Sequence, residues 1–475
     1  MIANLQPYPE YKEAGSKWLG RVPSGWEAVP LGRLLVQRIE QNRPVKTKDI
    51  LSLSLRQGVI PYSEKKSGGN KAKDDLSAYT LAYPGDIVLN SMNVVVGSVG
   101  LSKYFGAVSP VYYVLHTRSA SDSIHYFDGL FQDQTFQQSL WGLGNGIMFL
   151  QSKTTGKFNT IRMRIPMHAL RRVVIPYPPP EEQSTIVRFL DYANGRLERA
   201  IRAKRKMIAL LHEQKQAIIH RAVTRGLDPT VPLKPSGIPW LGDIPKHWEV
   251  LRSKYIYREV DKRSASGEET HLSMSQKFGL IPSSQIEEKR LVSESYAGAK
   301  LCEKGDLVLN RLKAHLGVFA LAPERGLVSP DYTVFRPGRE LEARYFEAVY
   351  RTPACRVELR QRAKGIVQGF WRLYTDDFYD IRMPVPPVDE QKRIMSQLDI
   401  DLSGVNTAIT RLEREIELLL EYRTRLVADV VTGKLDVRPA ARQLPAEPIP
   451  NLPAFEADDS VGEADFQPEA ADAKE

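Results

Sequence analysis

The stretch IVRFLDYANGRLERAIRAKRKMIALLHEQKQAIIHRAVTRG at residues 186–226 decides how this chain is organised. Apolar residues recur along it in steps of three and four, at Leu197, Ile201, Ile208, Leu211, Ile218 and Ala222. This spacing predicts an amphipathic helix with a single apolar seam. Residues 196–225 carry nine Lys or Arg against two Glu, so the remaining surface of the helix is basic. Such a helix needs a partner helix to bury its seam.

A second stretch with the same spacing, residues 391–432, lies 208 positions later in the chain. Its apolar seam consists of Val405, Ile409, Leu412, Ile416, Leu419, Leu426 and Val430. We predict that the two helices pair as an antiparallel coiled coil, in which thirty residues span about 45 Å. Lys215 and Arg423 interrupt the two seams at equivalent positions. A cation there either fixes the register of the pair or extends toward solvent at a helix end.

The repetition extends over most of the chain, which indicates a tandem duplication. The matching segments are Trp18-Leu19-Gly20 with Trp240-Leu241-Gly242, GDIVLN at 85–90 with GDLVLN at 305–310, Val108-Ser109-Pro110 and Tyr112 with Val328-Ser329-Pro330 and Tyr332, and IPYPPPEEQ at 175–183 with MPVPPVDEQ at 383–391. The offset is 222, then 220, and then 219 where Gly146-Ile147 match Gly365-Ile366. It falls by eleven to 208 because the first copy carries an extra stretch at 151–161. Each copy is predicted to be a globular module followed by a long helix.

The modules mix strand and helix patterns. The short apolar runs DIVLN and DLVLN follow turn residues and predict buried strands. Stretches 123–141 and 341–363 predict helices, the second interrupted at Pro353. The predicted fold class is therefore α+β. Its predicted parts are an N-terminal arm at 1–25, a first module at 26–180, a central helix at 181–228, a linker and repeat start at 229–247, a second module at 248–388, a C-terminal helix at 389–437, and an acidic, Pro/Ala-rich disordered tail at 438–475.

Composition is typical of a globular protein, with 42% hydrophobic and 26% charged residues. The N-terminus lacks the charged and apolar regions of a signal peptide, and no apolar run is long enough to span a membrane. Cys302 and Cys355 fit free thiols in a reducing cytoplasm, although one disulfide stays open. The net charge is +9, yet the tail holds nine Asp or Glu against three Lys or Arg. The basic remainder favours a polyanionic partner.

The usual catalytic motifs are absent from the sequence. There is no Walker loop, no HExxH, no CxxC, and no motif of the kind that amino-methyltransferases use to grip a flipped base. Asp86 and Asp306 could be nuclease carboxylates, but each stands at a turn where it can bond its own backbone. We therefore predict no catalytic residue and no metal site, which favours a binding protein.

Two half-repeats, each ending in Pro-Pro-x-x-Glu-Gln and a long helix, resemble the specificity (S) subunit of Type I restriction–modification enzymes. The resemblance covers about residues 10–437 and rests on the shared motifs together with the duplication. It implies that each module is a target recognition domain for one half of a bipartite DNA site. It also implies that the helices act as a ruler and dock two methyltransferase (M) subunits, which motor–nuclease (R) subunits join. The resulting complex would be a restriction endonuclease and adenine-N6 DNA methyltransferase, with S-adenosylmethionine, ATP and Mg2+ on the partner subunits and no cofactor on this chain.

Polar and basic residues near the shared motifs are the predicted contacts to double-stranded DNA. They are Lys65, Lys66, Asn70, Asn93, Lys153, Lys157, Gln276, Lys277, Arg311, Lys313, His315, Gln368 and Arg372. Arg311 suits guanine and Asn93 suits adenine, whereas Lys65, Lys66 and Lys157 suit phosphates. The alternative for each is a solvated surface residue, and for the extra stretch 151–161 an inert insertion. Because the modules diverge in these loops, we predict an asymmetric target.

Two other functions stay open at this point. One is a fused or free-standing DNA-modifying enzyme, which methylation by the chain alone would reveal. The other is a coiled-coil scaffold for proteins, for which duplex binding would lack the steep salt dependence of phosphate contacts.

Overall fold

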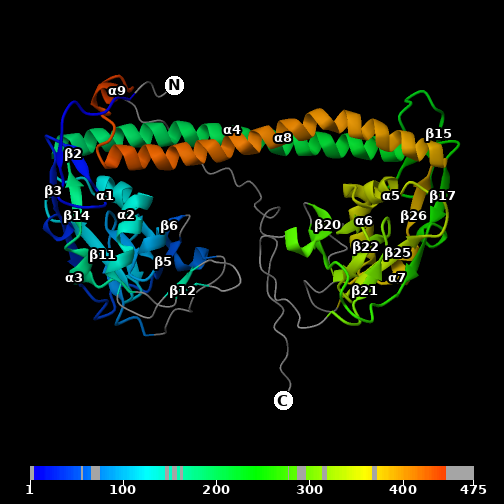
Figure 1. The fold of residues 1–475 in the computed structure, drawn as a ribbon, viewed down its shortest axis with the longest axis horizontal. Coiled ribbons are helices and arrows are strands. Elements are labelled where there is room, and N and C mark those ends of the chain that lie inside the picture. The colour runs from blue at the N-terminus through cyan, green and yellow to red at the C-terminus, as the bar shows by residue number, and fades with distance from the viewer. Residues whose placement is uncertain are drawn as a thin grey trace, which may run out of the picture. The chain divides into compact units, whose positions relative to one another are not determined.

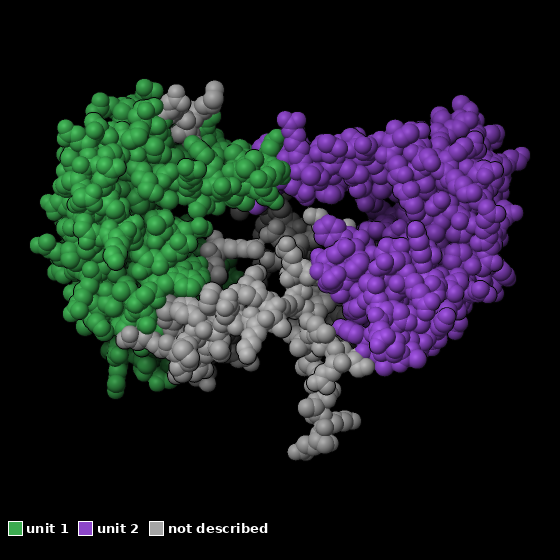
Figure 2. All heavy atoms as spheres, in the orientation of Figure 1, with its two compact units in different colours: residues 1–203, 414–455 green, residues 204–413, 456–475 purple. Residues whose placement is uncertain are grey.

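The computed structural model describes residues 5–54, 57–65, 75–144, 149–151, 158–160, 164–275, 278–285, 296–312, 318–365 and 372–445. The chain divides into two compact units, coloured separately in Figure 2. Unit 1 comprises Met1–Ala203 and Arg414–Phe455, and unit 2 comprises Lys204–Glu413 and Glu456–Glu475. Each unit contains one copy of the repeat and a segment of each long helix. The helices, predicted as separate parts, are each divided between the two units.

A four-stranded antiparallel sheet forms the centre of the first module (Figure 1). Its strands, in spatial order, are β4 (Leu35–Arg38), β11 (Tyr112–Thr117), β8 (Ile87–Asn90) and β9 (Val99–Leu101). Strand β8 is the predicted DIVLN strand, and its first three residues are fully buried, as expected for a short continuous apolar run.

Smaller elements surround this sheet. The antiparallel strand pairs are β1 (Tyr11–Glu13) with β2 (Arg21–Pro23), β3 (Glu27–Pro30) with β14 (Val174–Tyr177), β5 (Leu51–Ser54) with β6 (Gly58–Pro61), β7 (Thr80–Ala82) with β10 (Gly106–Val108), and β12 (Phe149–Gln151) with β13 (Phe158–Thr160). The helices are α1 (Ile124–Phe131), α2 (Gln134–Ser139) and α3 (Met167–Leu170). The single helix predicted over 123–141 was wrong. The Asp133 carboxylate accepts hydrogen bonds from the Thr135 and Phe136 amides and so starts a second helix.

Unit 2 repeats this plan. Its four-stranded sheet has the order β18 (Tyr257–Val260), β25 (Tyr332–Pro337), β22 (Leu307–Asn310) and β23 (Phe319–Leu321). Val308 pairs with Val334 in it, as Val88 pairs with Val114 in unit 1. The remaining strand pairs are β15 (Leu233–Pro235) with β16 (Asp243–Pro245), β17 (Glu249–Arg252) with β26 (Arg382–Val385), β19 (Leu272–Ser275) with β20 (Gly279–Pro282), and β21 (Lys300–Cys302) with β24 (Gly326–Val328).

The helices of the second module are α5 (Ala343–Tyr350), α6 (Pro353–Arg362) and α7 (Thr375–Tyr379). The predicted interruption at Pro353 is confirmed. Proline stands at the first turn of α6, and the Thr352 hydroxyl accepts a hydrogen bond from the Cys355 amide to cap that helix.

Two long helices, α4 (Pro180–Arg225) and α8 (Val388–Val431), follow the modules. Their starts explain the shared Glu-Gln motif. The buried Gln183 side chain accepts a hydrogen bond from the Ser123 amide at 2.9 Å, and Gln391 accepts one from the Glu342 amide at the same distance. Each glutamine also donates to a prolyl carbonyl five residues earlier. The glutamine therefore fixes the first turn of each long helix to its own module.

A buried tyrosine joins each module to the end of a long helix within the same unit. The Tyr126 hydroxyl donates to the Val431 carbonyl at 2.9 Å, and the Tyr345 hydroxyl donates to the Val223 carbonyl at 2.8 Å. Both rings are buried, so these bonds satisfy hydroxyls that would otherwise be costly to bury.

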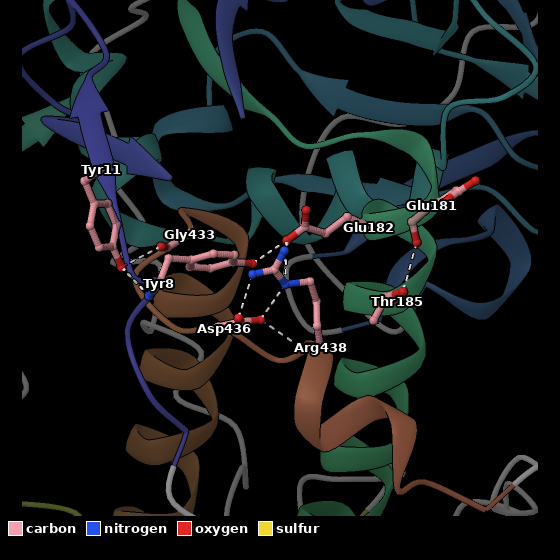
Figure 3. A network of polar contacts seen from close by, with 8 residues as sticks. All are labelled: Tyr8, Tyr11, Glu181, Glu182, Thr185, Gly433, Asp436 and Arg438. Atoms are coloured by element: carbon pink, nitrogen blue, oxygen red, sulfur yellow. Dashed lines mark hydrogen bonds and ion pairs between the residues drawn. The ribbon is translucent and has the colours of Figure 1, made fainter. Parts of the chain in front are cut away.

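Unit 1 also gathers the two described ends of the chain (Figure 3). The Asp436 amide donates to the Gln6 carbonyl at 2.8 Å, and the Tyr8 hydroxyl donates to the Glu182 carboxylate at 2.6 Å. Arg438 lies over the Tyr8 ring, pairs with Asp436 at 2.8 Å and approaches Glu182 at 3.7 Å. Burial and the Glu182 carboxylate raise the pKa of the Tyr8 hydroxyl.

Arg438 opens a short helix, α9 (Arg438–Arg442), which contains the buried Ala441. The prediction of a disordered tail from 438 onward is therefore wrong for these first residues. Pro439 in the first turn and packing of Ala441 against the unit 1 core account for the helix. The tail from 446 to 475 lies outside the described residues.

In the described part of the chain, no helix is long and apolar enough to cross a bilayer. Cys302 and Cys355 are buried free thiols.

Candidate nucleic-acid interface

Nine of the thirteen predicted DNA contacts lie outside the described residues. These are Lys66, Asn70, Lys153, Lys157, Gln276, Lys277, Lys313, His315 and Gln368. The extra stretch at 151–161 is partly described, through its strands β12 and β13. The structure therefore places four of the thirteen, namely Lys65, Asn93, Arg311 and Arg372.

The two described candidates of the first module stand at turns that follow strands. Lys65 follows a turn of 3-10 helix at Tyr62–Glu64, with its ammonium 5.5 Å from the centre of the Tyr62 ring. Asn93 is exposed and follows β8, directly before a second such turn at Val94–Val96. Both positions suit contact with a ligand outside the module.

The structure brings Arg311 and Arg372 together at the turn between β24 and β25. The Arg311 Nε donates to the Asp331 carbonyl at 2.9 Å, and the Arg372 Nη2 lies 3.7 Å from the Asp331 carboxylate. Lys300 joins them, because its buried Nζ donates to the Tyr332 carbonyl at 2.9 Å. Burial lowers the pKa of Lys300, with the opposing attraction of Asp261 smaller. Three cations and one half-exposed carboxylate thus surround a single turn.

The first module has the same backbone frame with different side chains. The Ser91 hydroxyl donates to the Val111 carbonyl at 2.7 Å, at the positions equivalent to Arg311 and Asp331. The Ile165 amide donates to the Ser91 carbonyl at 2.9 Å, as the Leu373 amide does to that of Arg311 at 3.1 Å. The frame is therefore common to both modules, and the charges on it are not.

Sequence reasoning missed Arg164, Lys300 and Asp331. Arg164 stands 208 positions before Arg372 and is exposed, with its guanidinium 5.8 Å from the centre of the Tyr113 ring. Applying the repeat offset to Arg372 would have found it. Asp331 lies inside the shared VSP.Y motif, at the one position where the two copies differ.

Asp86 and Asp306 are held by arginines within their own sheets. Arg38 reaches the Asp86 carboxylate through Nε at 2.8 Å and Nη2 at 3.0 Å. Arg336 reaches Asp306 through Nε at 2.9 Å and Nη2 at 2.6 Å. Each carboxylate also accepts a nearby backbone amide at 2.8 Å. These bonds favour the structural alternative for both aspartates.

The two arginines come from different strands of the common sheet. Arg38 is on β4, where the second module has Val260. Arg336 is on β25, where the first module has His116 on β11. The hydrogen bond to the carboxylate raises the pKa of each guanidinium. The ion pair is therefore retained in both modules although its cation has moved to another strand.

Two features of the described residues bear on catalysis, namely the state of the thiols and the arrangement of possible metal ligands. Burial raises the pKa of Cys302 to about 11 and that of Cys355 further, so neither thiol is a ready nucleophile at neutral pH. Within the described ranges, no group of three His, Cys, Asp or Glu side chains is arranged to hold a metal ion.

The seam cations of the long helices each bind the facing helix. In unit 2 the Lys215 Nζ donates to the Asn406 side chain at 2.7 Å, and in unit 1 Arg423 lies 3.5 Å from Glu198. Glu198 and Asn406 are themselves equivalent at the offset of 208. The helix segments are antiparallel within each unit, and the same cross-helix pair occurs once in each. Every predicted seam residue is buried or half-buried.

The outer surface of the helices carries exposed leucines at equivalent positions. Leu210 on α4 is 55% exposed and Leu418 on α8 is 48% exposed, and they differ by 208. Met207 lies beside the first and Tyr422 beside the second, at 53% and 43% exposure. Each long helix thus offers an apolar patch outside its seam.

The duplicated α+β modules and their paired helix segments define a class of protein built from two similar modules, each followed by a long helix. Comparison with known proteins narrows this class. The chain is 22% identical over 456 residues to the "Type I restriction enzyme MjaVIII specificity subunit" of Methanocaldococcus jannaschii, covering 90% of this chain and 97% of that protein. It is 24% identical over 280 residues to the "Putative type I restriction enzyme MjaX specificity subunit" of the same organism, covering 57% of this chain and 61% of that protein's length.

A solved structure has a similar fold. It is a chain of a type I R-M system studied for complex assembly and conformational transition, with a TM-score of 0.56 at 16% identity, covering 87% of this chain and 99% of that one. No protein-family model matches. The resemblance to the specificity subunits of Type I restriction–modification enzymes, predicted from the sequence, is confirmed by these relatives.

Proposed function

We propose that this chain is the DNA-specificity subunit of a Type I restriction–modification complex, in which each module reads one half of an asymmetric bipartite site. The observation that carries the proposal is a common backbone frame that bears different polar groups in the two modules. Ser91 and Val111 occupy the positions that Arg311 and Asp331 occupy in the second module. A recognition surface duplicated and then altered at these turns suits two different half-sites.

The long helices would set the spacing between the half-sites. Helices of 46 and 44 residues are each about 65–70 Å long, whereas one turn of duplex is about 34 Å. The cross-helix pairs of Lys215 with Asn406 and of Arg423 with Glu198 oppose a shift of register, since a shift by one heptad would separate all four groups.

The same helices would dock two copies of a methyltransferase subunit. Leu210 and Leu418 are exposed at equivalent positions, so two similar surfaces are available to one kind of partner. Methyl transfer would take place on those subunits, which would bind S-adenosylmethionine. Motor–nuclease subunits would join them and bind ATP and Mg2+. The chain itself would be non-catalytic.

Co-expression with a Type I methyltransferase subunit from the same host tests the proposal. The expected result is a complex whose mass corresponds to one copy of this chain and two methyltransferase subunits. Long-read mapping of methylated adenines in the same cells should reveal one bipartite, asymmetric sequence. A stable monomer that recruits no methyltransferase, or methylation without any sequence preference, would contradict the proposal.

A further inference from the structure

Comparison of the two modules distinguishes the contacts that both share from the side chains that differ. Only the side chains that differ can give the two modules different base preferences. In both modules a side chain at position 91 or 311 donates to the backbone carbonyl at position 111 or 331. This contact is common to both and therefore belongs to the frame. What differs is the chemistry added to it, because Ser91 and Val111 carry no charge whereas Arg311 and Asp331 carry one each.

Arg311 is held in a way that leaves its donor fork available. Its bond to the Asp331 carbonyl uses Nε, and neither Nη nitrogen bonds another residue within the described ranges, so both can meet an acceptor outside the module. The same bond ties the guanidinium to the backbone of Asp331, the residue that carries the carboxylate. The Asp331 side chain is 50% exposed, at a turn next to the end of β22. A double donor and an acceptor thus occupy one short stretch of surface.

A carboxylate is an unfavourable group to place against DNA phosphates, since like charges repel. Within the major groove it has a specific partner, because aspartate accepts a hydrogen bond from the cytosine N4 amino group. Arginine donates to guanine O6 and N7 in the same groove. We propose that Arg311 and Asp331 together read one G·C base pair of the second half-site, Arg311 contacting guanine and Asp331 contacting cytosine. This inference rests on the proposed function.

Arg372 has a different role in this arrangement. The first module has an equivalent arginine, Arg164. Because both modules carry this arginine, it cannot distinguish one half-site from the other, and it suits a phosphate contact. Arg372 lies 3.7 Å from the Asp331 carboxylate, with both groups well exposed. Such an exposed ion pair is weak and is easily exchanged for a phosphate. In this proposal the ion pair with Arg372 orients the Asp331 carboxylate until DNA is bound.

The test uses the full chain in complex with its methyltransferase subunits. After the wild-type site is mapped, the complex is titrated with duplexes in which each base pair of the second half-site is changed in turn. The variants are Asp331→Asn, which keeps the shape of the side chain, and Asp331→Val, which installs the residue of the first module. Asp380→Asn is the matched control, since Asp380 is 56% exposed and pairs with Arg252 at 3.5 Å in the same module.

The expected result is a loss of discrimination at a single G·C pair of the second half-site, by roughly ten- to a hundredfold. The first half-site should be unchanged, and Asp380→Asn should behave as wild type. Unaltered discrimination at every position in both Asp331 variants would overturn the proposed base contact while leaving the bipartite function intact. Loss of preference in the first half-site as well would also overturn it. A wild-type complex without any sequence preference would overturn the proposed function itself.

Discussion

The ion pair between Arg336 and Asp306 allows a direct test of how the sheet of the second module is stabilised. Its arginine is on β25, whereas the equivalent pair of the first module takes Arg38 from β4. Arg336→His gives the second module the residue that the first module has at the equivalent position. The substitution removes two charge-assisted hydrogen bonds, at 2.9 Å and 2.6 Å, from a carboxylate that is 3% exposed. Adding Val260→Arg then supplies a guanidinium from β18, as Arg38 does from β4 in the first module.

The size of the effect follows from burial. Breaking a fully buried ion pair costs about 3–5 kcal/mol. The Arg336 side chain is 30% exposed and the Glu303 amide still binds Asp306, so water compensates part of the loss. We expect Arg336→His to lower the free energy of unfolding of unit 2 by about 2–3 kcal/mol. This corresponds to roughly 30- to 150-fold more frequent opening. The double variant should recover at least half of that loss.

Amide hydrogen exchange followed by mass spectrometry resolves the two units separately. Exchange in β22 and β25 should accelerate in Arg336→His, while exchange in β8 and β11 serves as the internal control. Arg252→His is the matched variant, because the Arg252–Asp380 pair is exposed on both sides and should contribute less than about 1 kcal/mol. If amide hydrogens exchange as fast in the double variant as in Arg336→His, an arginine on β18 cannot replace Arg336 as the partner of Asp306.

Three further predictions concern unit 1 and the proposed interface. Tyr8→Phe removes the 2.6 Å bond to Glu182 and should lower the stability of unit 1 by about 1 kcal/mol in urea titration; an unchanged midpoint would show that Arg438 alone holds the arm. Burial raises the pKa of Asp128 to about 6, so its native-state contribution to stability is present below pH 4 and is lost as pH rises through 6. Asp128→Asn should therefore stabilise the protein by about 1–2 kcal/mol at pH 7.5 and have little effect at pH 4, and equal effects at both pH values would contradict the assignment. Arg164→Ala and Arg372→Ala should each reduce the slope of log K against log salt by about 1 in duplex binding, and an unchanged slope would exclude a phosphate contact.

Much of the fold could be predicted because the informative patterns are local. The strand at Ile87–Asn90 is a continuous apolar run after a turn, and the seam of α4 repeats every three or four residues. The duplication added long-range information, since each matching segment had to occupy the same place in its module. The break between α1 and α2 was missed because Asp133 was not considered as a helix cap.

The candidate interface was less predictable, because its contacts join residues that are distant in the chain. Nothing near Arg336 in the sequence indicates that it binds Asp306, and the equivalent arginine of the first module is on another strand. Asp331 was overlooked for a related reason. Its proposed role depends on Arg311, twenty residues away, whose Nε bonds the Asp331 carbonyl where the turn lies beside the end of β22.

The order in which the segments of the two units follow one another along the chain has a consequence for its synthesis. The described part of unit 2 is one continuous stretch of sequence, whereas unit 1 needs residues on both sides of it. The core of unit 1 includes Leu426, Val430 and Val431 from the end of α8. At about 5–20 residues per second, the ribosome takes ten seconds or more to proceed from the end of the first module to these residues. The N-terminal module therefore emerges first but completes its core last, and during that interval its apolar face is exposed to chaperones and to other nascent chains.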